Sequence, residues 1–168
     1  MTRKRLMLVL LVTMVIPLGA VGIRAISVSA AGAQEAPFRG SYSGTAAFTS
    51  ATTITFSGTG IATHLGSGAN EGRVVVTGPD SSCHGGIANV NYETLTAANG
   101  DTLLLTSYDV ACPISPGVLH GTGHWVVTGG TGRFSGASGQ GTIDGHADFN
   151  QGVFSFQFTG TLSAPSQG

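Results

Sequence analysis

The chain has 168 residues, with seven basic residues against eight acidic ones and a formal net charge of −1. Four of the basic residues precede residue 25, so the rest of the chain keeps three arginines, no lysine and all eight acids, a net charge of −5. Nucleic acids and anionic membrane surfaces attract clustered lysine and arginine. Neither is an expected partner.

The first 33 residues have the pattern of a secretory signal peptide. Arg3, Lys4 and Arg5 precede an apolar run from Leu6 to Val21, and the small residues Ala31 to Ala33 offer a cleavage site. The alternative is an uncleaved membrane anchor, which the proline and glycines within the run disfavour. We therefore predict a signal peptide over 1–33, a secreted mature chain over 34–168, and no stable membrane insertion after cleavage.

The mature segment predicts β-strands and no helix. Its length suits one domain, and its apolar residues alternate with polar ones, most clearly in "VFSFQFTG", where Phe154, Phe156 and Phe158 share one face. Many short antiparallel strands must form a sandwich or close into a barrel. The expected strands are Ser41 to Thr49, Thr52 to Ser57, Gly60 to His64, Gly72 to Thr77, Ile87 to Thr96, Thr102 to Val110, Val118 to Thr128, Gly141 to Phe149 and Val153 to Leu162.

Cys83 and Cys112 are the only cysteines of the chain. In an exported protein such a pair most often forms a disulfide, and we predict one here, with both cysteines in flanking loops. Two buried free thiols are the alternative.

The glycine-rich segment "GGTGRFSGASGQG" could cradle a phosphate or turn a strand. A P-loop needs a lysine after its last glycine and then a helix, whereas here Arg133 follows Gly132 and a strand is expected beyond. The spacing also departs from the dinucleotide fingerprint. We interpret the glycines as a structural corner where a strand bends, with Arg133 on the barrel rim paired to a carboxylate. The corner residues are Gly129, Gly130, Gly132 and Gly136.

Three segments carry a resemblance to a known family. "VVTGGTGRFSGASGQGTI" (Val126 to Ile143) resembles the glycine-rich signature of plant allene oxide cyclases and dirigent proteins. "GTGIATHLGSG" (Gly58 to Gly68) and "TAANGDTLLLT" (Thr96 to Thr106) are similar to exported bacterial proteins of that superfamily. The resemblance implies a single antiparallel eight-stranded β-barrel. Family members guide cyclisation or coupling of apolar intermediates inside the barrel, but their pocket residues cannot be aligned here, so no catalytic residue is carried over.

The histidines do not predict a metal site. His120 and His124 would share a strand face about 13 Å apart, too far to hold one ion. Asp144, His146 and Asp148 alternate along one strand, but the opposite face suits the core, so they are expected to form a solvated outer stripe. We predict no metal and no cofactor.

The hairpin around Asn99 and Gly100 gives the only candidate ligand site. A two-residue turn would place Asn91 opposite Tyr108 and Glu93 opposite Thr106, on one face with Leu95 and Leu104. If that face lines the barrel, it forms an apolar cavity with a few polar groups. If it points outward, these are ordinary surface residues, and the apolar residues of the other face favour this second interpretation. The ligand-binding candidates are Asn91, Glu93 and Tyr108.

Two functions follow as hypotheses. The first is an exported barrel that binds a small apolar ligand inside, with possible action as a cofactor-free cyclase or isomerase. The alternative is a non-enzymatic exported domain whose outer surface engages another protein or the cell envelope.

Overall fold

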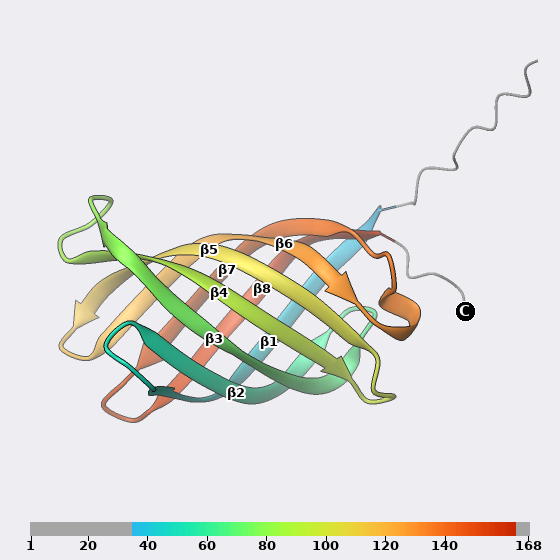
Figure 1. The fold of residues 1–168 in the computed structure, drawn as a ribbon, viewed down its shortest axis with the longest axis horizontal. Helices are drawn as coiled ribbons and strands as arrows, with labels where there is room; N and C mark the ends of the chain where they lie inside the picture. Colours follow the sequence, from blue (N-terminus) through green and yellow to red (C-terminus); the bar gives the residue numbers. More distant parts are fainter. Residues whose placement is uncertain (1–34, 164–168) are drawn as a thin grey trace, which may run out of the picture. The chain divides into compact units, whose positions relative to one another are not determined.

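A computed structural model describes residues 35–163, which form one closed antiparallel barrel (Figure 1). Each strand pairs with the next along the chain, and the last pairs with the first. This confirms the predicted fold class; the predicted signal peptide lies outside the described residues. No helix within 35–163 is long and apolar enough to cross a membrane. The strands are β1 (Glu35–Phe48), β2 (Thr53–Ala62), β3 (Gly66–Asp80), β4 (Gly86–Ala97), β5 (Thr102–Ser115), β6 (Val118–Gly130), β7 (Gly139–Asp148) and β8 (Val153–Ser163).

The alternation in the sequence matches the two faces of the barrel wall. In β8, Phe154 and Phe158 are buried in the lumen, whereas Ser155 and Gln157 on the other face are exposed. Successive side chains of a strand point to opposite faces, so period two in the sequence becomes inside and outside in the barrel.

Two of the nine predicted segments are one strand. The segments Thr52 to Ser57 and Gly60 to His64 merge into β2, because Gly58 does not break the strand. A Cβ atom at Gly58 would overlap the backbone of β1, and one at Gly60 would overlap the ring of Tyr42. These glycines permit close contact between neighbouring strands rather than marking a turn.

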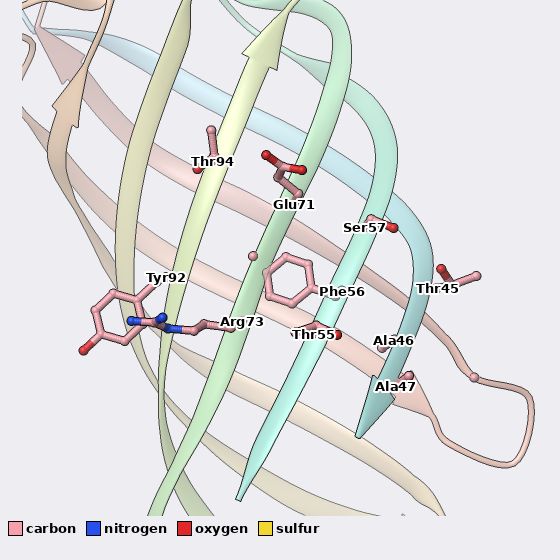
Figure 2. Close-up of a pocket in the computed structure, with 12 residues that line it drawn as sticks. Thr45, Ala46, Ala47, Thr55, Phe56, Ser57, Glu71, Arg73, Tyr92 and Thr94 are labelled. Carbon is pink, nitrogen blue, oxygen red and sulfur yellow. The ribbon is translucent and has the colours of Figure 1, made fainter. Parts of the chain in front are cut away.

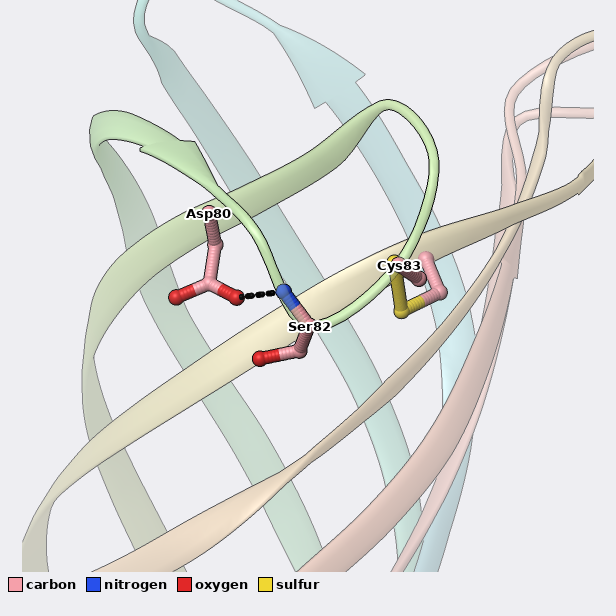
Figure 3. Close-up of a disulfide and its surroundings, with 4 residues drawn as sticks. Asp80, Ser82 and Cys83 are labelled. Atoms are coloured by element: carbon pink, nitrogen blue, oxygen red, sulfur yellow. Dashed lines mark hydrogen bonds between the residues drawn. A yellow bond between two sulfur atoms is a disulfide. The ribbon is translucent and has the colours of Figure 1, made fainter.

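The predicted disulfide is present between Cys83 and Cys112, with the Cα atoms 6.0 Å apart (Figure 3). Cys83 lies in the β3–β4 loop, where the backbone N–H of Ser82 donates to a carboxylate oxygen of Asp80 at 2.7 Å. Cys112, however, lies within β5 rather than in a loop, because β5 pairs with β6 as far as Ser115. The bridge therefore fastens a loop to the barrel wall.

The glycine-rich segment forms the β6–β7 connection and not a bend within one strand. Gly129 and Gly130 end β6, and a short 3₁₀ turn follows, η1 (Gly132–Phe134). Gly132, its first residue, and Gly136, two residues beyond its end, adopt positive φ angles of 57° and 72°. That turn inserts Phe134 into the core, where it is 0% exposed. The glycines thus allow the chain to close one end of the barrel with an aromatic ring.

Arg133 is paired as expected. Its Nε atom lies 3.5 Å from Oδ2 of Asp101 in the neighbouring β4–β5 hairpin. The ion pair ties the β6–β7 connection to that hairpin at the same end of the barrel.

The lumen has a packed end and a more open end. The packed end contains the fully buried rings of Phe38, Trp125 and Phe134, and Phe38 meets Trp125 edge to face at 5.3 Å between centroids. A smaller apolar cluster formed by Ala46, Ile54, Phe56 and Phe154 occupies the other half. Polar side chains lie between the two clusters, and they form the candidate site.

Candidate functional site in the barrel lumen

The β4–β5 hairpin has a three-residue loop, and the register differs from the predicted one by one residue. The N–H of Ala97 donates to the carbonyl of Asp101 at 2.9 Å, and that of Gly100 donates to the carbonyl of Ala97 at 2.9 Å. Gly100 has φ 89°. A type I turn followed by a left-handed glycine is a common three-residue connection. Asn91 therefore pairs with Ser107, and Glu93 with Leu105.

This one-residue difference decides which predicted site residues meet. Asn91 and Glu93 point into the lumen and are 7% and 3% exposed. Tyr108 points outward, is 47% exposed and stacks on His124 with 5.4 Å between ring centroids. The placement of Tyr108 beside Asn91 and Glu93 was wrong, because a slip of one residue moves every side chain of a strand to the other face. Ser107 and Asp109 take its place.

Asn91, Glu93, Ser107 and Asp109 form one hydrogen-bonded cluster with Asn70. The Asn91 amide donates to Oγ of Ser107 at 3.1 Å and to the Asp109 carboxylate. Ser107 Oγ donates to Oε1 of Glu93 at 3.3 Å, and Asn70 Nδ2 donates to Oε2 of Glu93 at 3.4 Å. The cluster therefore connects two carboxyl groups through an amide and a hydroxyl, all on the inner face of β3, β4 and β5.

Both carboxyl groups have a raised pKa, Glu93 more than Asp109. Burial, and then the charge of Asp109, raise the pKa of Glu93 from 4.5 to about 8. Burial likewise raises the pKa of Asp109 to about 6, although the hydrogen bond from Asn91 and the nearby hydroxyl of Ser107 oppose this shift. Glu93 therefore keeps its proton to higher pH than Asp109, which is the first of the pair to ionise.

Several buried polar atoms in and near this cluster have no hydrogen-bond partner within the described protein. They are the side-chain oxygens Oδ1 of Asn70, Asn91 and Asp109, together with the hydroxyl of Tyr42. Burial, and then the charge of Glu93, raise the pKa of Tyr42 to about 12, so its hydroxyl stays protonated as a donor. Buried polar groups are nearly always satisfied, and unsatisfied ones cost about 1 to 3 kcal/mol each. Polar groups of water or of a bound molecule would satisfy them.

A cavity of about 120 Å³ adjoins this cluster in the more open half of the lumen. Asn91, Glu93 and Asp109 border it on one side, and its other walls are mainly apolar. Gly121 also lines it, and a Cβ atom at this position would meet nothing within 4 Å. The apolar lining comes chiefly from Ile54, Phe56, Val74, Leu119, Ile143, Phe154 and Phe156.

A larger but shallow groove of about 840 Å³ lies against the outer wall of β1 to β4 (Figure 2). Its most distinctive feature is Arg73, whose guanidinium carbon lies 4.8 Å from the centre of the Tyr92 ring. Glu71 also borders it and is exposed. The groove contains none of the buried unsatisfied polar atoms, so the lumen is the stronger candidate for a specific small-molecule site.

The predicted outer stripe is outside the lumen, as expected. Asp144 and His146 are exposed on β7, and the carboxylate of Asp148 accepts hydrogen bonds from the β7–β8 turn, at 2.9 Å from the N–H of Asn150. The structure adds His120 from β6, which pairs directly with His146. Reasoning along single strands missed this neighbour, because it depends on the register between two strands.

Comparison with known proteins identifies the fold but no family. No protein-family model matches the chain, and no curated protein matches it. A similar solved structure is that of a pterocarpan synthase dirigent protein, with a TM-score of 0.50 and 14% sequence identity over 88% of this chain and 100% of that one. The likeness supports a dirigent-like barrel fold, in line with the resemblance seen in the sequence.

Proposed function

We propose that the barrel binds a small, mainly apolar molecule in the lumen, with its polar group directed to Asn91, Glu93 and Asp109. The observation that carries this proposal is a pair of unsatisfied buried oxygens, Oδ1 of Asn91 and Oδ1 of Asp109, on residues that line an apolar cavity. A ligand that carries a hydroxyl or another hydrogen-bond donor would satisfy these acceptor oxygens while its apolar part is removed from water. The similar barrel is that of a pterocarpan synthase dirigent protein, and the resemblance seen in the sequence implies reactions of apolar intermediates inside such barrels, which favours the same use of this lumen.

The cavity volume limits the size of the ligand. A dry apolar cavity of roughly 150 Å³ accommodates benzene, and sites for drug-sized ligands have roughly 300 to 1,000 Å³. At about 120 Å³, the lumen suits a single ring or a short branched chain. A longer molecule would extend out of the open end of the barrel.

The two carboxyl groups suit proton transfer to and from such a ligand. A protonated Glu93 can donate to a ligand oxygen, and an ionised Asp109 can accept a proton from a neighbouring atom. Paired groups whose pKa values differ in this way commonly serve as the acid and the base of one reaction. An isomerisation or a cyclisation needs only such a transfer and no cofactor, so we include this activity in the proposal.

Thermal unfolding with p-cresol and toluene tests the binding proposal. The two molecules share a ring, but only p-cresol has a hydroxyl for the polar cluster. We expect p-cresol to raise the melting temperature in a saturable way and toluene to raise it less. A ligand at about 100 times its Kd adds about 2.7 kcal/mol to the free energy of unfolding, which is several degrees for a domain of this size.

The matched variants are Gly121→Leu and Thr122→Leu. The first fills the cavity, because a side chain at Gly121 points into open space in the lumen; the second adds a leucine to the outer face one residue away. Stabilisation by p-cresol should be lost in the first variant and kept in the second. Equal stabilisation of both variants would show that p-cresol binds elsewhere.

We also propose that the protein is exported. The basic and apolar pattern of residues 1–33 and the disulfide between Cys83 and Cys112 both support this. Detection of a chain that begins near Gln34 outside the cells, by mass spectrometry, would test it. A full-length chain retained in the cells would contradict the proposal.

The alternative function is a non-enzymatic contact through the outer wall. The shallow groove with Arg73 over Tyr92 is the observation that favours it, because arginine and tyrosine are enriched in binding hot spots. Tyr92→Ala would weaken such a contact and leave p-cresol stabilisation unchanged, so the two functions can be separated.

A further inference from the structure

We propose that His120, Asp144 and His146 form a binding site for a divalent transition-metal ion, Zn²⁺ or Cu²⁺, on the outer wall of the barrel. The site links β6 to β7, and its side chains lie on the outer face, where Asp144 and His146 are exposed. Each residue offers one ligand atom, and these atoms all lie within 4.8 Å of one another.

The strand register brings the three side chains together. His120 on β6 lies directly opposite His146 on β7, and Asp144 is two residues from His146 on the same outer face. The imidazole rings are 4.6 Å apart at their centroids and 19° from parallel. Cross-strand and diagonal neighbours on one face are close enough for their side chains to meet. The backbone therefore holds three donors in one place without any loop.

The distances fit one ion. Nε2 of His120 lies 3.1 Å from Oδ2 of Asp144. Bonds of about 2.0 to 2.2 Å from zinc to nitrogen or oxygen separate neighbouring ligand atoms by roughly 3 to 4 Å. Small side-chain rotations would bring all three atoms to this separation. Solvent supplies the remaining ligand, because His120 and Asp144 are accessible, with side chains 38% and 65% exposed.

The donor types select the kind of ion. Two imidazole nitrogens and one carboxylate suit Zn²⁺ and Cu²⁺, whereas Ca²⁺ and Mg²⁺ prefer oxygen ligands alone. Neither β6 nor β7 contains a lysine or an arginine that would repel a cation. The side-chain hydrogen bond between His120 and Asp144 is exposed and contributes little by itself, so a bound metal would add a stronger link between side chains of these paired strands.

The ligands lie on regular strands next to the disulfide. His120 lies opposite Cys112 on β5, and Cys112 is fixed by the disulfide to Cys83. Ligands held by regular strands keep their positions more closely than ligands on loops. The site thus lies on the paired strands β6 and β7, and β6 pairs on its other side with β5, which the disulfide fastens.

Calorimetric titration of the full, untagged, metal-free protein with zinc chloride and copper chloride tests the proposal. We expect one ion per chain, and a Kd that is at least about tenfold weaker in His120→Ala and in His146→Ala. His124→Ala is the matched control, since His124 lies on the same outer face of β6, outside the cluster, and its loss should not change the Kd. Circular dichroism of each variant shows whether the barrel is intact.

Side-chain NMR signals of the five histidines locate the ion independently of any variant. Zinc should shift the signals of His120 and His146 and leave those of His64, His84 and His124 in place. Binding weaker than about 1 mM for both metals, an equal loss of affinity in His124→Ala, or shifts centred on the other histidines would each overturn the proposal.

Discussion

Replacement of Glu93 by glutamine should stabilise the barrel at neutral pH and flatten the dependence of its stability on pH. The glutamine keeps the shape of the carboxyl group and cannot ionise. Its amide can still contact Ser107 and Asn70, the two hydrogen-bond partners of Glu93. The variant therefore removes the cost of protonating Glu93 on folding, with little change in packing.

The magnitude follows from the pKa of Glu93, which rises from 4.5 to about 8 on folding. A carboxyl group with a raised pKa binds more protons in the folded state, so it lowers the free energy of unfolding as pH rises from 4.5 to 8. Linkage gives a loss of about 1 kcal/mol by pH 5 and about 3 kcal/mol by pH 7, as an upper bound. Asp109, with a pKa of about 6, adds a smaller loss over the same range.

Urea unfolding followed by the fluorescence of Trp125 measures this directly, since Trp125 is the only tryptophan and is fully buried. Between pH 5 and pH 7 the wild type should lose about 2 to 3 kcal/mol more stability than Glu93→Gln. That is a difference of about 1 to 3 M in the urea midpoint. Glu71→Gln on the outer wall is the control and should follow the wild type. Parallel pH profiles for the wild type and Glu93→Gln would refute the assignment of a buried, neutral Glu93.

Other predictions test the neighbours of Glu93, the disulfide and the closed end of the barrel. Asp109→Asn removes the charge that helps to raise the pKa of Glu93, so carboxyl NMR should show Glu93 titrating at lower pH, and an unchanged or higher titration would contradict the coupling. Replacement of Cys83 and Cys112 together by alanine should cost about 3 to 4 kcal/mol in urea unfolding, and an unchanged midpoint would show that the bridge adds nothing. Phe134→Ala should cost about 3 to 5 kcal/mol and Phe134→Leu clearly less, whereas equal small losses would mean that the ring does not close the barrel.

The fold could be predicted from the sequence because alternation is a property of each strand alone. Phe154 and Phe158 identify the inner face of β8 without any knowledge of its neighbours. The closure of the end by Phe134 could not be foreseen in the same way. Its burial depends on a 3₁₀ turn that leaves the sheet, and the glycines around it indicate only that unusual backbone angles are allowed.

Only part of the candidate site could be predicted from the sequence. Asn91 and Glu93 could be placed on one face of β4, but the apolar residues of the other face favoured an outward orientation, which is wrong because both side chains are buried in the lumen. Their partners depended on the length of the loop around Asn99 and Gly100. The pair Asn-Gly is typical of a two-residue loop, yet here it belongs to a three-residue one. That difference of one residue exchanges Tyr108 for Asp109 in the lumen.

The histidine cluster shows the same dependence on register. Asp144 and His146 could be placed on one face from the sequence of β7. His120 joins them only through the pairing of β6 with β7, and the irregular connection between these strands gives no rule for their alignment.

The central claim is that the lumen beside Glu93 and Asp109 is a ligand site. An NMR titration of isotopically labelled protein with p-cresol tests it most directly, because each backbone amide reports its own surroundings. We predict saturable shifts concentrated at lumen residues of β4 and β5, including Asn91 and Glu93, and their loss in Gly121→Leu. Shifts centred on the outer groove around Arg73 and Tyr92, or no saturable shifts at all, would contradict the claim.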